Sequence, residues 1–469
     1  MMVCTLLEPR LDELKDAIRE LDPLADAFEI RLDALTEDTD PRAIRRLTTK
    51  PLIATCRRTT ENGAFNGPEH DRLAMLETCI HAGFEYADVE GPTTLPAPEE
   101  RLIRSRHEKR ATPSVATIVR MAQESGRNGA LFKFAAPTHS FADVLTMLSA
   151  ARQLSSEHRR FALMGLGDFP RALLHLWGSA FTYGGGRTTA PGQPPLEEIR
   201  RTLTHWGAPS AARNPYLVVG DPVHHSLSPR IHNAGFRLLG LDAAYGALRV
   251  PTGLELQMLL EAAPRIGLAG LSVTTPLKDA AFENCERRTP EEEAAHAVNC
   301  IRLEPEGPIG HNTDGLGARR VVEELLPNTH GRILLAGTGG AARAIASQLK
   351  GQDLTIAGRR DEHLAPLAER FGARAVPLLV AAANLRDYDL IINATRSLEP
   401  FPVHGYQGAL FDLHYEAART PWERYATESH LPAAGGRELL LEQGVAAFEF
   451  WTGKTAPADE MRKALEDGP

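Results

Sequence analysis

The sequence has few cysteines and no long apolar stretch. Its five cysteines are widely spaced and contain no C-x-x-C pair. An odd number without close pairs argues against a disulfide framework and a zinc site, so we expect a reducing compartment and no bound metal. No apolar stretch is long enough to cross a bilayer, which argues against a transmembrane protein.

Runs of a single charge are also missing. Lys and Arg form no basic cluster, and the formal net charge of −9 is modest for 469 residues. Neither nucleic acid nor an anionic membrane is therefore expected as a partner. Residues 2–7 lead directly into Glu8 and Arg10, without the features of a signal or transit peptide. We expect a cytoplasmic protein that acts on small molecules as a monomer or small homo-oligomer.

What the sequence does contain is an average globular composition over a length that needs more than one core. It is 43% hydrophobic and 24% charged, and two or three domains are expected. Residues 1–207 alternate short apolar strands with amphipathic helices, which predicts a parallel sheet and, with eight repeats, a (β/α)₈ TIM barrel. The eight strands are expected at residues 2–7, 28–33, 51–57, 86–90, 102–107, 130–136, 161–165 and 180–184.

Polar side chains share one face of several of these strands. Successive strand residues point in opposite directions, so Glu29 lies with Arg31, Ser105 lies with His107, and Lys133 lies opposite its phenylalanine neighbours. The active site of such a barrel is built at the C-terminal ends of its strands. A solvated polar face is the alternative, but parallel sheets rarely have one.

Lys133 and His107 together favour carbonyl chemistry. An amine buried among Phe and Ala is disfavoured in its charged form, and a neutral amine attacks a ketone to give an iminium ion. The iminium acidifies the neighbouring C–H, for which His107 is the candidate base. Glu61 is the candidate to orient the imidazole, and arginines would bind a substrate carboxylate. Lys133 or His107 alone would more often have a structural role, but their occurrence together favours a catalytic role.

These residues carry a family resemblance. Residues 28–33, Ser-Arg-His at 105–107, the Lys133 strand and residues 189–193 resemble the type I 3-dehydroquinate dehydratases over about residues 2–206. The resemblance implies metal-free elimination of water from 3-dehydroquinate, with an imine on Lys133, proton transfer by His107 and assistance from Glu61. Arg106 stands where the family usually has Asn, and Thr189 where it has Ser. The implied substrate-binding residues are Glu29, Arg31, Arg57, Arg171, Thr189 and Gln193.

A second α/β region follows a short linker at residues 208–215. We expect a substrate-binding α/β domain at residues 216–318, completed by a helical tail at 436–469, and a Rossmann domain at 319–435. In the first of these, strands are expected at residues 216–220, 243–250, 268–273 and 298–303. In the second, they are expected at residues 332–336, 353–357, 388–393 and 408–413.

The Rossmann region contains a glycine-rich turn between a strand and a helix. Its spacing, G-x-G-x-x-A at residues 337–342, suits a pyrophosphate at a helix N-terminus, although a simple tight turn is the alternative. Arg359 and Arg360 follow the next strand, where an acidic residue would favour NAD; two arginines favour NADP. The expected cofactor-binding residues are Gly337, Gly339, Gly340, Ala341, Ala342, Arg359, Arg360 and Asn393.

Four motifs precede that turn, of which the first alone would be a helix cap and the last alone a turn. They are Ser-Leu-Ser-Pro at 226–229, residues 272–278, Ala-Val-Asn at 297–299 and Asn-Thr-Asp-Gly at 312–315. In this order they resemble the shikimate dehydrogenases, from about residue 216 to the end. The resemblance implies Lys278 and Asp314 as the acid/base pair. It implies Ser226, Ser228, Thr274, Asn299, Tyr415 and Gln443 as substrate-binding residues.

Three positions depart from the usual shikimate dehydrogenase pattern: Ser272 replaces Asn, Cys300 replaces Thr, and Arg396 interrupts Asn-Ala-Thr-Ser. The two implied reactions are consecutive, since the 3-dehydroshikimate formed by dehydration is the ketone that is reduced to shikimate. We therefore expect a bifunctional enzyme. A Schiff-base aldolase fused to a quinate-type dehydrogenase, or a non-catalytic quinate or shikimate sensor, remains as an alternative.

Overall fold

The chain divides into two compact units in the computed structural model. One consists of Met1–Pro215 with Glu261–Leu268, and the other of Tyr216–Leu260 with Ala269–Pro469. The described residues are 1–37, 39–91, 93–125, 129–167, 169–186, 193–209, 211–327, 331–359, 361–415 and 419–467. Within these ranges, no helix is long and apolar enough to cross a membrane, and no cluster of His, Cys, Asp and Glu is arranged to hold a metal ion.

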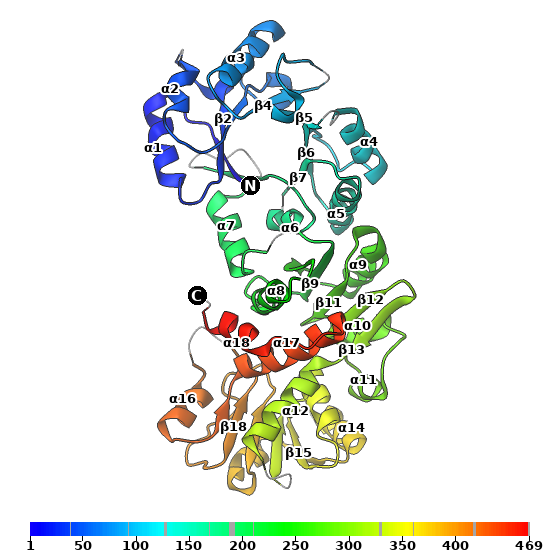
Figure 1. Ribbon diagram of the computed structural model, residues 1–469. Coiled ribbons are helices and arrows are strands. Elements are labelled where there is room, and N and C mark those ends of the chain that lie inside the picture. Colours follow the sequence, from blue (N-terminus) through cyan, green and yellow to red (C-terminus); the bar gives the residue numbers. More distant parts are fainter. Residues whose placement is uncertain are drawn as a thin grey trace. The chain divides into compact units, whose positions relative to one another are not determined.

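Eight parallel strands form a near-closed barrel in the first unit, as the sequence predicts; they are the blue-to-green ring in Figure 1. Their order is β7-β6-β5-β4-β3-β2-β1-β8, and Ala180 N donates to Phe161 O (2.7 Å) where β7 and β8 approach each other. The strands are β1 (Met2–Leu6), β2 (Ala27–Arg31), β3 (Leu52–Thr55), β4 (Tyr86–Glu90), β5 (Leu102–His107), β6 (Leu131–Pro137), β7 (Phe161–Leu166) and β8 (Thr182–Gly185).

The inside of the barrel changes from apolar to polar along the strands. A first layer of side chains forms the buried core of the barrel and includes Val3, Ala27, Ile53, Ile103, Leu131 and Phe181. Two positions further along the same strands stand Thr5, Glu29, Thr55, Ser105, Lys133 and Tyr183, all buried. Because side chains two apart share a face, this second layer points into the barrel as well. The predicted polar face is therefore confirmed.

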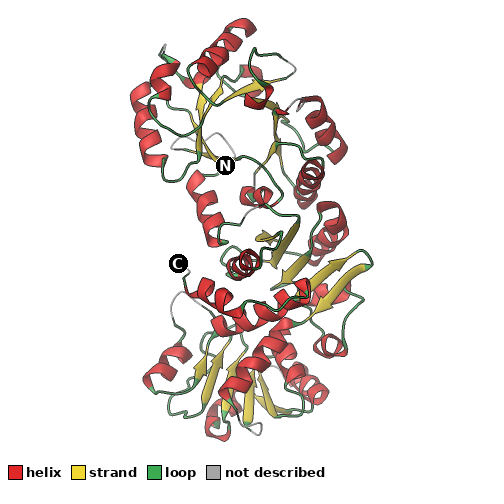
Figure 2. Ribbon diagram, viewed as in Figure 1, coloured by secondary structure: helices red, strands yellow, loops and turns green. Residues whose placement is uncertain are grey.

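Helices surround the strands on the outside (Figure 2). In α1, the apolar side chains of Leu14, Ile18 and Leu21 fall on one face and are buried, as expected for a helix packed against a sheet. A reciprocal capping box between Ser140 and Asp143 starts α5. The helices are α1 (Leu11–Leu21), α2 (Pro41–Arg45), α3 (Glu69–His81), α4 (Val115–Ser125), α5 (Phe141–Ser156), α6 (Arg171–Leu176) and α7 (Leu196–His205).

The second unit contains two sheets. The first has the order β10-β9-β11-β12-β13. Its last strand was not expected from the sequence, because Gly-Pro-Ile-Gly-His lacks an alternating pattern. β9 begins two residues before the strand expected at residue 216. The elements are β9 (Asn214–Gly220), β10 (Ala243–Arg249), β11 (Gly270–Val273), β12 (Cys300–Glu304), β13 (Gly307–His311), α8 (Ser228–Leu238), α9 (Gly253–Ile266), α10 (Lys278–Asn284), α11 (Pro290–Ala295) and α12 (Thr313–Leu325).

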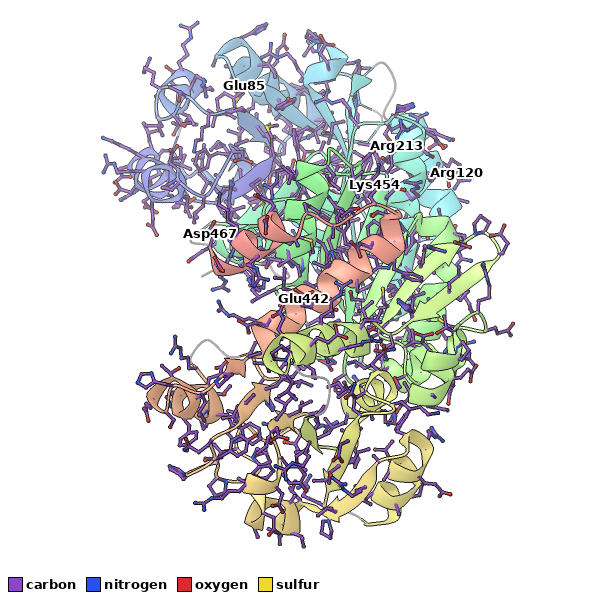
Figure 3. The ribbon with its side chains drawn as sticks, turned by 60° about the horizontal axis from the view of Figure 1, so that its bottom comes forward. Glu85, Arg120, Arg213, Glu442, Lys454 and Asp467 are labelled. Atoms are coloured by element: carbon purple, nitrogen blue, oxygen red, sulfur yellow. The ribbon has the colours of Figure 1, made fainter. Side chains whose placement is uncertain are left out.

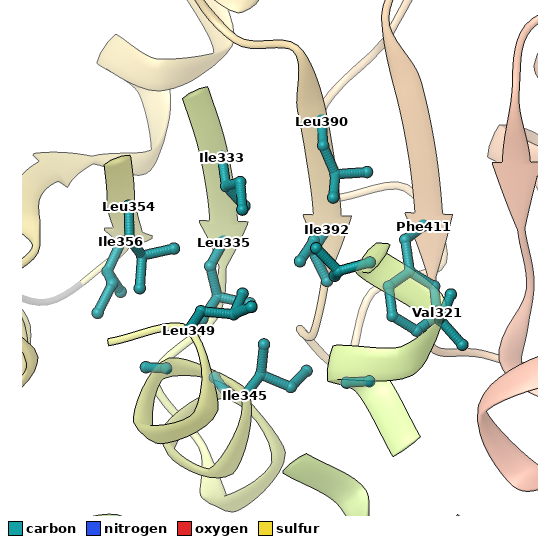
Figure 4. Packing of buried hydrophobic residues seen from close by; sticks show 14 of the residues in the cluster. Val321, Ile333, Leu335, Ile345, Leu349, Leu354, Ile356, Leu390, Ile392 and Phe411 are labelled. Atoms are coloured by element: carbon teal, nitrogen blue, oxygen red, sulfur yellow. The ribbon is translucent and has the colours of Figure 1, made fainter. Parts of the chain in front are cut away.

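The second sheet is parallel, with the order β16-β15-β14-β17-β18-β19. Figure 4 shows one face of it packed against helices, with Leu335 and Ile392 of the sheet near Ile345 of α13. The two edge strands were missed from the sequence, since one is largely exposed and the other has two residues. The strands are β14 (Arg332–Ala336), β15 (Asp353–Gly358), β16 (Arg374–Pro377), β17 (Leu390–Asn393), β18 (Ala409–Asp412) and β19 (Ala433–Ala434). The helices are α13 (Gly340–Gln348), α14 (Asp361–Phe371), α15 (Leu378–Ala383) and α16 (Pro421–Glu428).

The C-terminal helices α17 (Gly436–Thr452) and α18 (Ala458–Glu466) fold back on the unit, as expected for the tail. Glu442 of α17, labelled in Figure 3, forms ion pairs with Arg320 of α12 (3.4 Å) and Arg462 of α18 (3.9 Å). Gly317 of α12 allows the closest approach, because a Cβ there would lie 2.6 Å from Gln443 N. This packing brings Gln443 next to the start of α12.

Candidate active sites

Lys133 lies in a cavity of about 420 Å³ at the C-terminal ends of the barrel strands. Its side chain is buried, and Nζ contacts Glu29 (2.6 Å) and Asp88 (2.8 Å). Nζ also lies 4.1 Å from the centre of the Tyr183 ring. The expectation of a buried amine is confirmed, but the expectation of apolar surroundings is wrong. Phe132 and Phe134 lie on the other face of β6, and carboxylates meet the amine instead.

Both carboxylates at Lys133 are held in their ionised form. Burial raises the pKa of Glu29, but the charges of Lys133 and Arg57 outweigh it and bring that pKa to about 2. The pKa of Asp88 is likewise lowered, because Lys133 and Arg57 overcome the effect of burial. Glu29 Oε1 also accepts from Thr55 (2.9 Å), and its Oε2 accepts from Thr5 (2.8 Å). Glu29 therefore orients the lysine in addition to lining the cavity.

His107 ends β5, next to Lys133 on β6, and lines the same cavity. Its side chain is 13% exposed, and Nδ1 lies 3.6 Å from Glu61 Oε2, which is just longer than a hydrogen bond. Burial lowers the pKa of His107, while Glu61 partly raises it again. The imidazole is thus neutral near pH 7 and able to accept a proton. The predicted pairing of Glu61 with His107 agrees with this geometry.

The predicted arginines line the same cavity, and each has a local partner. Arg31 pairs with Asp33 (2.6 Å), because a 3₁₀ turn at Leu32–Ala34 ends the strand earlier than expected. Arg57 approaches Glu90 (3.4 Å). Arg171 donates to Tyr183 O (3.0 Å), and burial lowers its pKa to about 10. Gln193 also lines the cavity, whereas Thr189 lies outside the described residues.

Two residues of this cavity region were not selected from the sequence. Asp88 contacts Lys133 directly and accepts a hydrogen bond from Ser105. The sequence feature that could have identified Asp88 is its position on the polar face of β4, two positions before Glu90. Tyr183 lines the cavity, and its buried hydroxyl has no hydrogen-bond partner among the described residues. No sequence signal distinguished Tyr183 from an ordinary core tyrosine.

A smaller cavity of about 150 Å³ in the second unit gathers the predicted acid/base pair. Lys278, the first residue of α10, donates to Asp314 near the start of α12. Asn299 Nδ2 donates to the other oxygen of Asp314 (2.7 Å), and Asn299 Oδ1 accepts from Thr313 N (2.7 Å). The amide of Asn299 therefore fixes the orientation of the carboxylate that Lys278 faces.

The remaining predicted substrate-binding residues of this unit line the same small cavity. Ser228 begins α8, and Ser226 Oγ accepts from Ser228 N (3.3 Å). Hydroxyl groups at the positive end of a helix suit a carboxylate. The cavity is lined by Ser226, Ser228, Thr274, Lys278, Asn299, Asp314, Tyr415 and Gln443, among others.

A buried glutamate that was not selected from the sequence supports the start of α12. Glu292 Oε1 accepts from His311 Nδ1 (2.9 Å) and from Asn312 N (3.0 Å). Asn312 caps α12 by accepting from Gly315 N (3.2 Å), and its Nδ2 donates to Ala297 O (2.9 Å). These bonds hold the turn that presents Asp314. The glutamate lies 22 residues before Asp314, so no local motif indicated it.

A third cavity, of about 380 Å³, shares Lys278 and Leu413 with the small one. Gly339, Gly340 and Ala341 line it at the N-terminus of α13, which has no side-chain cap. A Cβ on Gly339 would meet nothing within 4 Å, so the backbone here is open to a ligand. Unfilled N–H groups at such a turn suit a phosphate group. The donor set therefore fits a dinucleotide.

The other predicted cofactor residues lie around this turn. Gly337 has φ +129°, and a Cβ there would lie 2.6 Å from Ala394 O, so only glycine fits. Arg359 is exposed directly after β15, and Arg360 lies outside the described residues. Ala342 and Asn393 are buried; they support the turn and the loop after β17 and are not part of the cavity lining.

Comparison with known proteins matches separate parts of the chain to separate families. Residues 2–208 match the family Type I 3-dehydroquinase. Residues 218–301 match the shikimate dehydrogenase substrate binding domain. Residues 320–404 match shikimate / quinate 5-dehydrogenase, and residues 436–466 match the shikimate 5'-dehydrogenase C-terminal domain.

Individual relatives agree with these matches. A shikimate dehydrogenase (NADP(+)) of Methanosarcina acetivorans is 36% identical over 270 residues, covering 53% of this chain and 96% of that protein. A chloroplastic bifunctional 3-dehydroquinate dehydratase/shikimate dehydrogenase of Arabidopsis thaliana is 27% identical over 479 residues, covering 93% of this chain and 79% of that protein. The crystal structure of a shikimate dehydrogenase in complex with NADP+ is 30% identical with a TM-score of 0.50, covering 54% of this chain and 95% of that one.

Proposed function

We propose that two separate active sites catalyse two reactions in this chain. The chain belongs to the shikimate dehydrogenase family and carries a type I 3-dehydroquinase domain ahead of the dehydrogenase part. The chain is a bifunctional 3-dehydroquinate dehydratase and shikimate dehydrogenase of the shikimate pathway. Its cofactor is NADP. The residue roles below are supported by the cavities and contacts of each unit.

In the first unit, Lys133 forms the covalent bond. Its amine, once deprotonated, attacks the ketone of 3-dehydroquinate, and loss of water gives an imine. His107 removes a proton from the carbon next to the imine and then gives it to the hydroxyl group that leaves as water. Hydrolysis of the iminium returns Lys133 and releases 3-dehydroshikimate. Glu29 and Asp88 stabilise the positive charge that the nitrogen carries through these steps.

Arg31, Arg57, Arg171 and Gln193 surround the substrate in this proposal. Their donors line the cavity around Lys133, and a guanidinium group binds a carboxylate through two parallel hydrogen bonds. Thr189 remains a proposed substrate contact on the basis of the family resemblance alone.

In the second unit, Lys278 and Asp314 move the proton of the reduction. NADPH, when bound, supplies the hydride. Lys278 lines both the small cavity and the third cavity, which supports a role beside both the carbonyl carbon and the hydride donor. It donates to the developing alkoxide and is reprotonated through Asp314. Ser226 and Ser228 hold the carboxylate, while Thr274, Asn299, Tyr415 and Gln443 contact the ring hydroxyls.

The observation that carries this proposal is that each lysine lines a cavity together with its proton-transfer partner. We propose that residues 1–207 form the dehydratase domain and that residues 208–215 form a linker. Residues 216–318 with 436–469 would then form the shikimate-binding domain, and residues 319–435 the NADP-binding domain. We further propose a cytoplasmic monomer or small homo-oligomer without nucleic acid or membrane partners. The five buried free thiols and the mixed surface charge support this.

The test is to separate the two activities by single substitutions. Lys133→Ala is expected to abolish dehydration, which is measured by the absorbance of the conjugated product. The same variant is expected to leave NADPH-dependent reduction of 3-dehydroshikimate unchanged. Lys278→Ala is expected to do the reverse. Borohydride added with 3-dehydroquinate is expected to trap an adduct on Lys133, detected as a mass increase in the peptide that contains it.

The untouched activity shows that the other unit is intact, and thermal unfolding of each variant checks the fold of the substituted unit. Lys15→Ala, on the exposed face of α1, removes a similar charge and is expected to change neither rate. Loss of both activities in a folded Lys133→Ala protein, or borohydride treatment without any mass increase, would contradict the proposal.

A further inference from the structure

The loop after β17 places an arginine at the cofactor cavity that none of the roles above uses. Arg396 is exposed and lines the third cavity together with Gly339, Gly340 and Ala341. Among the described residues, Arg396 has no ion-pair partner. The shikimate dehydrogenase pattern usually has serine at this position, so the positive charge of Arg396 is a departure of this chain from that pattern.

The backbone on both sides of Arg396 is held by a buried amide. Asn393 Oδ1 accepts from Thr395 N (3.1 Å), and Asn393 Nδ2 donates to Ser397 O (3.0 Å). The same amide donates to Asp412 Oδ1 (3.1 Å) on the neighbouring strand. Gly337 packs against Ala394 from the glycine-rich turn. The loop is therefore anchored against that turn, and the arginine extends from a fixed base.

The other charged side chains of this cavity already have partners. Lys278 pairs with Asp314, and Arg343 pairs with Asp279. His414 Nδ1 lies 2.8 Å from Asp412 Oδ1. Arg396 is thus the cation in the described part of the cavity that is left to bind an anionic ligand. It lines a space to which the start of α13 contributes backbone N–H groups.

We propose that Arg396 is a cofactor-binding residue that contacts the diphosphate bridge of NADP. This inference rests on the proposed reductase function. A guanidinium group binds two phosphate oxygens at once and keeps its charge at any working pH. The uncapped α13 N-terminus supplies backbone donors to the same group. Arg359, at the end of β15, serves the 2′-phosphate instead, so the two arginines act on different parts of the cofactor.

The test uses the full chain and equilibrium binding of three ligands: NADP+, NAD+ and adenosine 2′-monophosphate. NAD+ keeps the diphosphate bridge but lacks the 2′-phosphate, whereas adenosine 2′-monophosphate keeps only the latter. Arg396→Ser is expected to weaken NADP+ and NAD+ by the same factor, about tenfold, as for one charge-assisted contact. Its affinity for adenosine 2′-monophosphate is expected to stay unchanged.

Two matched variants complete the design. Arg359→Ser is expected to show the opposite pattern, with weaker NADP+ and adenosine 2′-monophosphate but unchanged NAD+. Arg386→Ser removes the same charge from an exposed site before β17, at the other end of that strand, and is expected to change none of the three. Thermal unfolding without ligand is expected to be the same for wild type and Arg396→Ser, since the side chain is exposed.

The outcomes separate this inference from the proposed function. If the wild-type chain binds neither dinucleotide, the reductase proposal itself fails. If the wild type binds both and Arg396→Ser binds them equally well, only the role of Arg396 is refuted. A loss of adenosine 2′-monophosphate affinity in Arg396→Ser would also refute it, because the side chain would then serve the other end of the cofactor.

Discussion

His107 is subject to two opposing influences. Burial favours its neutral form and lowers the pKa, while the nearby Glu61 carboxylate favours the charged form and raises it. Burial wins, so the base stays available to below pH 6.5, the ordinary value for histidine. Protonation removes the base, and dehydration is therefore lost as the pH falls through this lowered pKa.

The first prediction concerns that balance. Glu61→Gln removes the negative charge that favours the imidazolium, so the acid limb of the dehydratase rate is expected to move to lower pH, by up to about one unit. The measurement is kcat/KM for 3-dehydroquinate as a function of pH. Glu197→Gln, at an exposed site of α7, is expected to leave the limb in place. A midpoint that rises in Glu61→Gln would show that the carboxylate does not favour the charged imidazole.

The start of α12 shows how one element positions a reacting group. Asp314 stands in the first turn of that helix. The turn before it is held by Glu292, which is 1% exposed and bonded to His311, Asn312 and Thr289. An unsatisfied donor in such a buried place costs about 1–3 kcal/mol. Losing the glutamate is therefore expected to disturb the turn.

Glu292→Gln is expected to lower kcat for 3-dehydroshikimate reduction by about tenfold, and Glu292→Ala by more, because hydrogen bonds to a charged group are the stronger ones. The affinity for NADP+ and the dehydratase rate are expected to stay unchanged. Glu293→Gln alters the adjacent, exposed carboxylate, which pairs with Arg288 (2.7 Å), and is the matched control. Equal kcat values in Glu292→Gln and wild type would rule out a positioning role.

At the scale of the whole molecule, the core of the second unit contains a histidine that is packed among aromatic rings. The ring of His232 stacks on Tyr245 (4.7 Å between centres) and packs near Trp451 (5.0 Å). Neither ring nitrogen has a hydrogen-bond partner among the described residues. Burial lowers the pKa of His232 to about 3, so the folded unit contains it in the neutral form.

The third prediction is an acid sensitivity of the reductase unit. Because the pKa in the folded state lies below the unfolded value of about 6.5, the stabilisation from the neutral ring is complete above pH 6.5. This stabilisation is lost progressively as the pH falls towards 3, and the loss amounts to about 3 kcal/mol at about pH 4.5. His232→Phe keeps an aromatic ring but cannot be protonated, so it is expected to shift acid inactivation of the reductase to lower pH.

The two activities make this measurable in one chain. Residual reductase and dehydratase rates are measured at pH 7 after incubation at lower pH. His404→Phe, at an exposed site, is the control and is expected to behave as wild type. The predicted dependence on His232 is contradicted if wild type and His232→Phe lose reductase activity at the same pH.

The sequence by itself determined the features that depend on residues close together in the chain. Short apolar runs separated by helical segments predicted all eight barrel strands, and the two-residue period of a strand predicted the side of β6 from which Lys133 points. The glycine spacing at residues 337–342 predicted the strand–turn–helix unit. Short motifs supplied the two lysines, His107 and Asp314. These patterns succeed because backbone period and turn geometry depend on near neighbours in the chain.

Only the tertiary structure decided which groups surround those residues. Glu29 reaches Lys133 across 104 positions and Asp88 across 45, so closure of the barrel and strand register replaced an expected apolar pocket with two carboxylates. The role of Glu292 likewise depends on elements that meet only after folding, since its partners His311 and Asn312 lie 19 and 20 positions away. Contacts between distant segments are set by packing and register, and a local pattern contains no information about them.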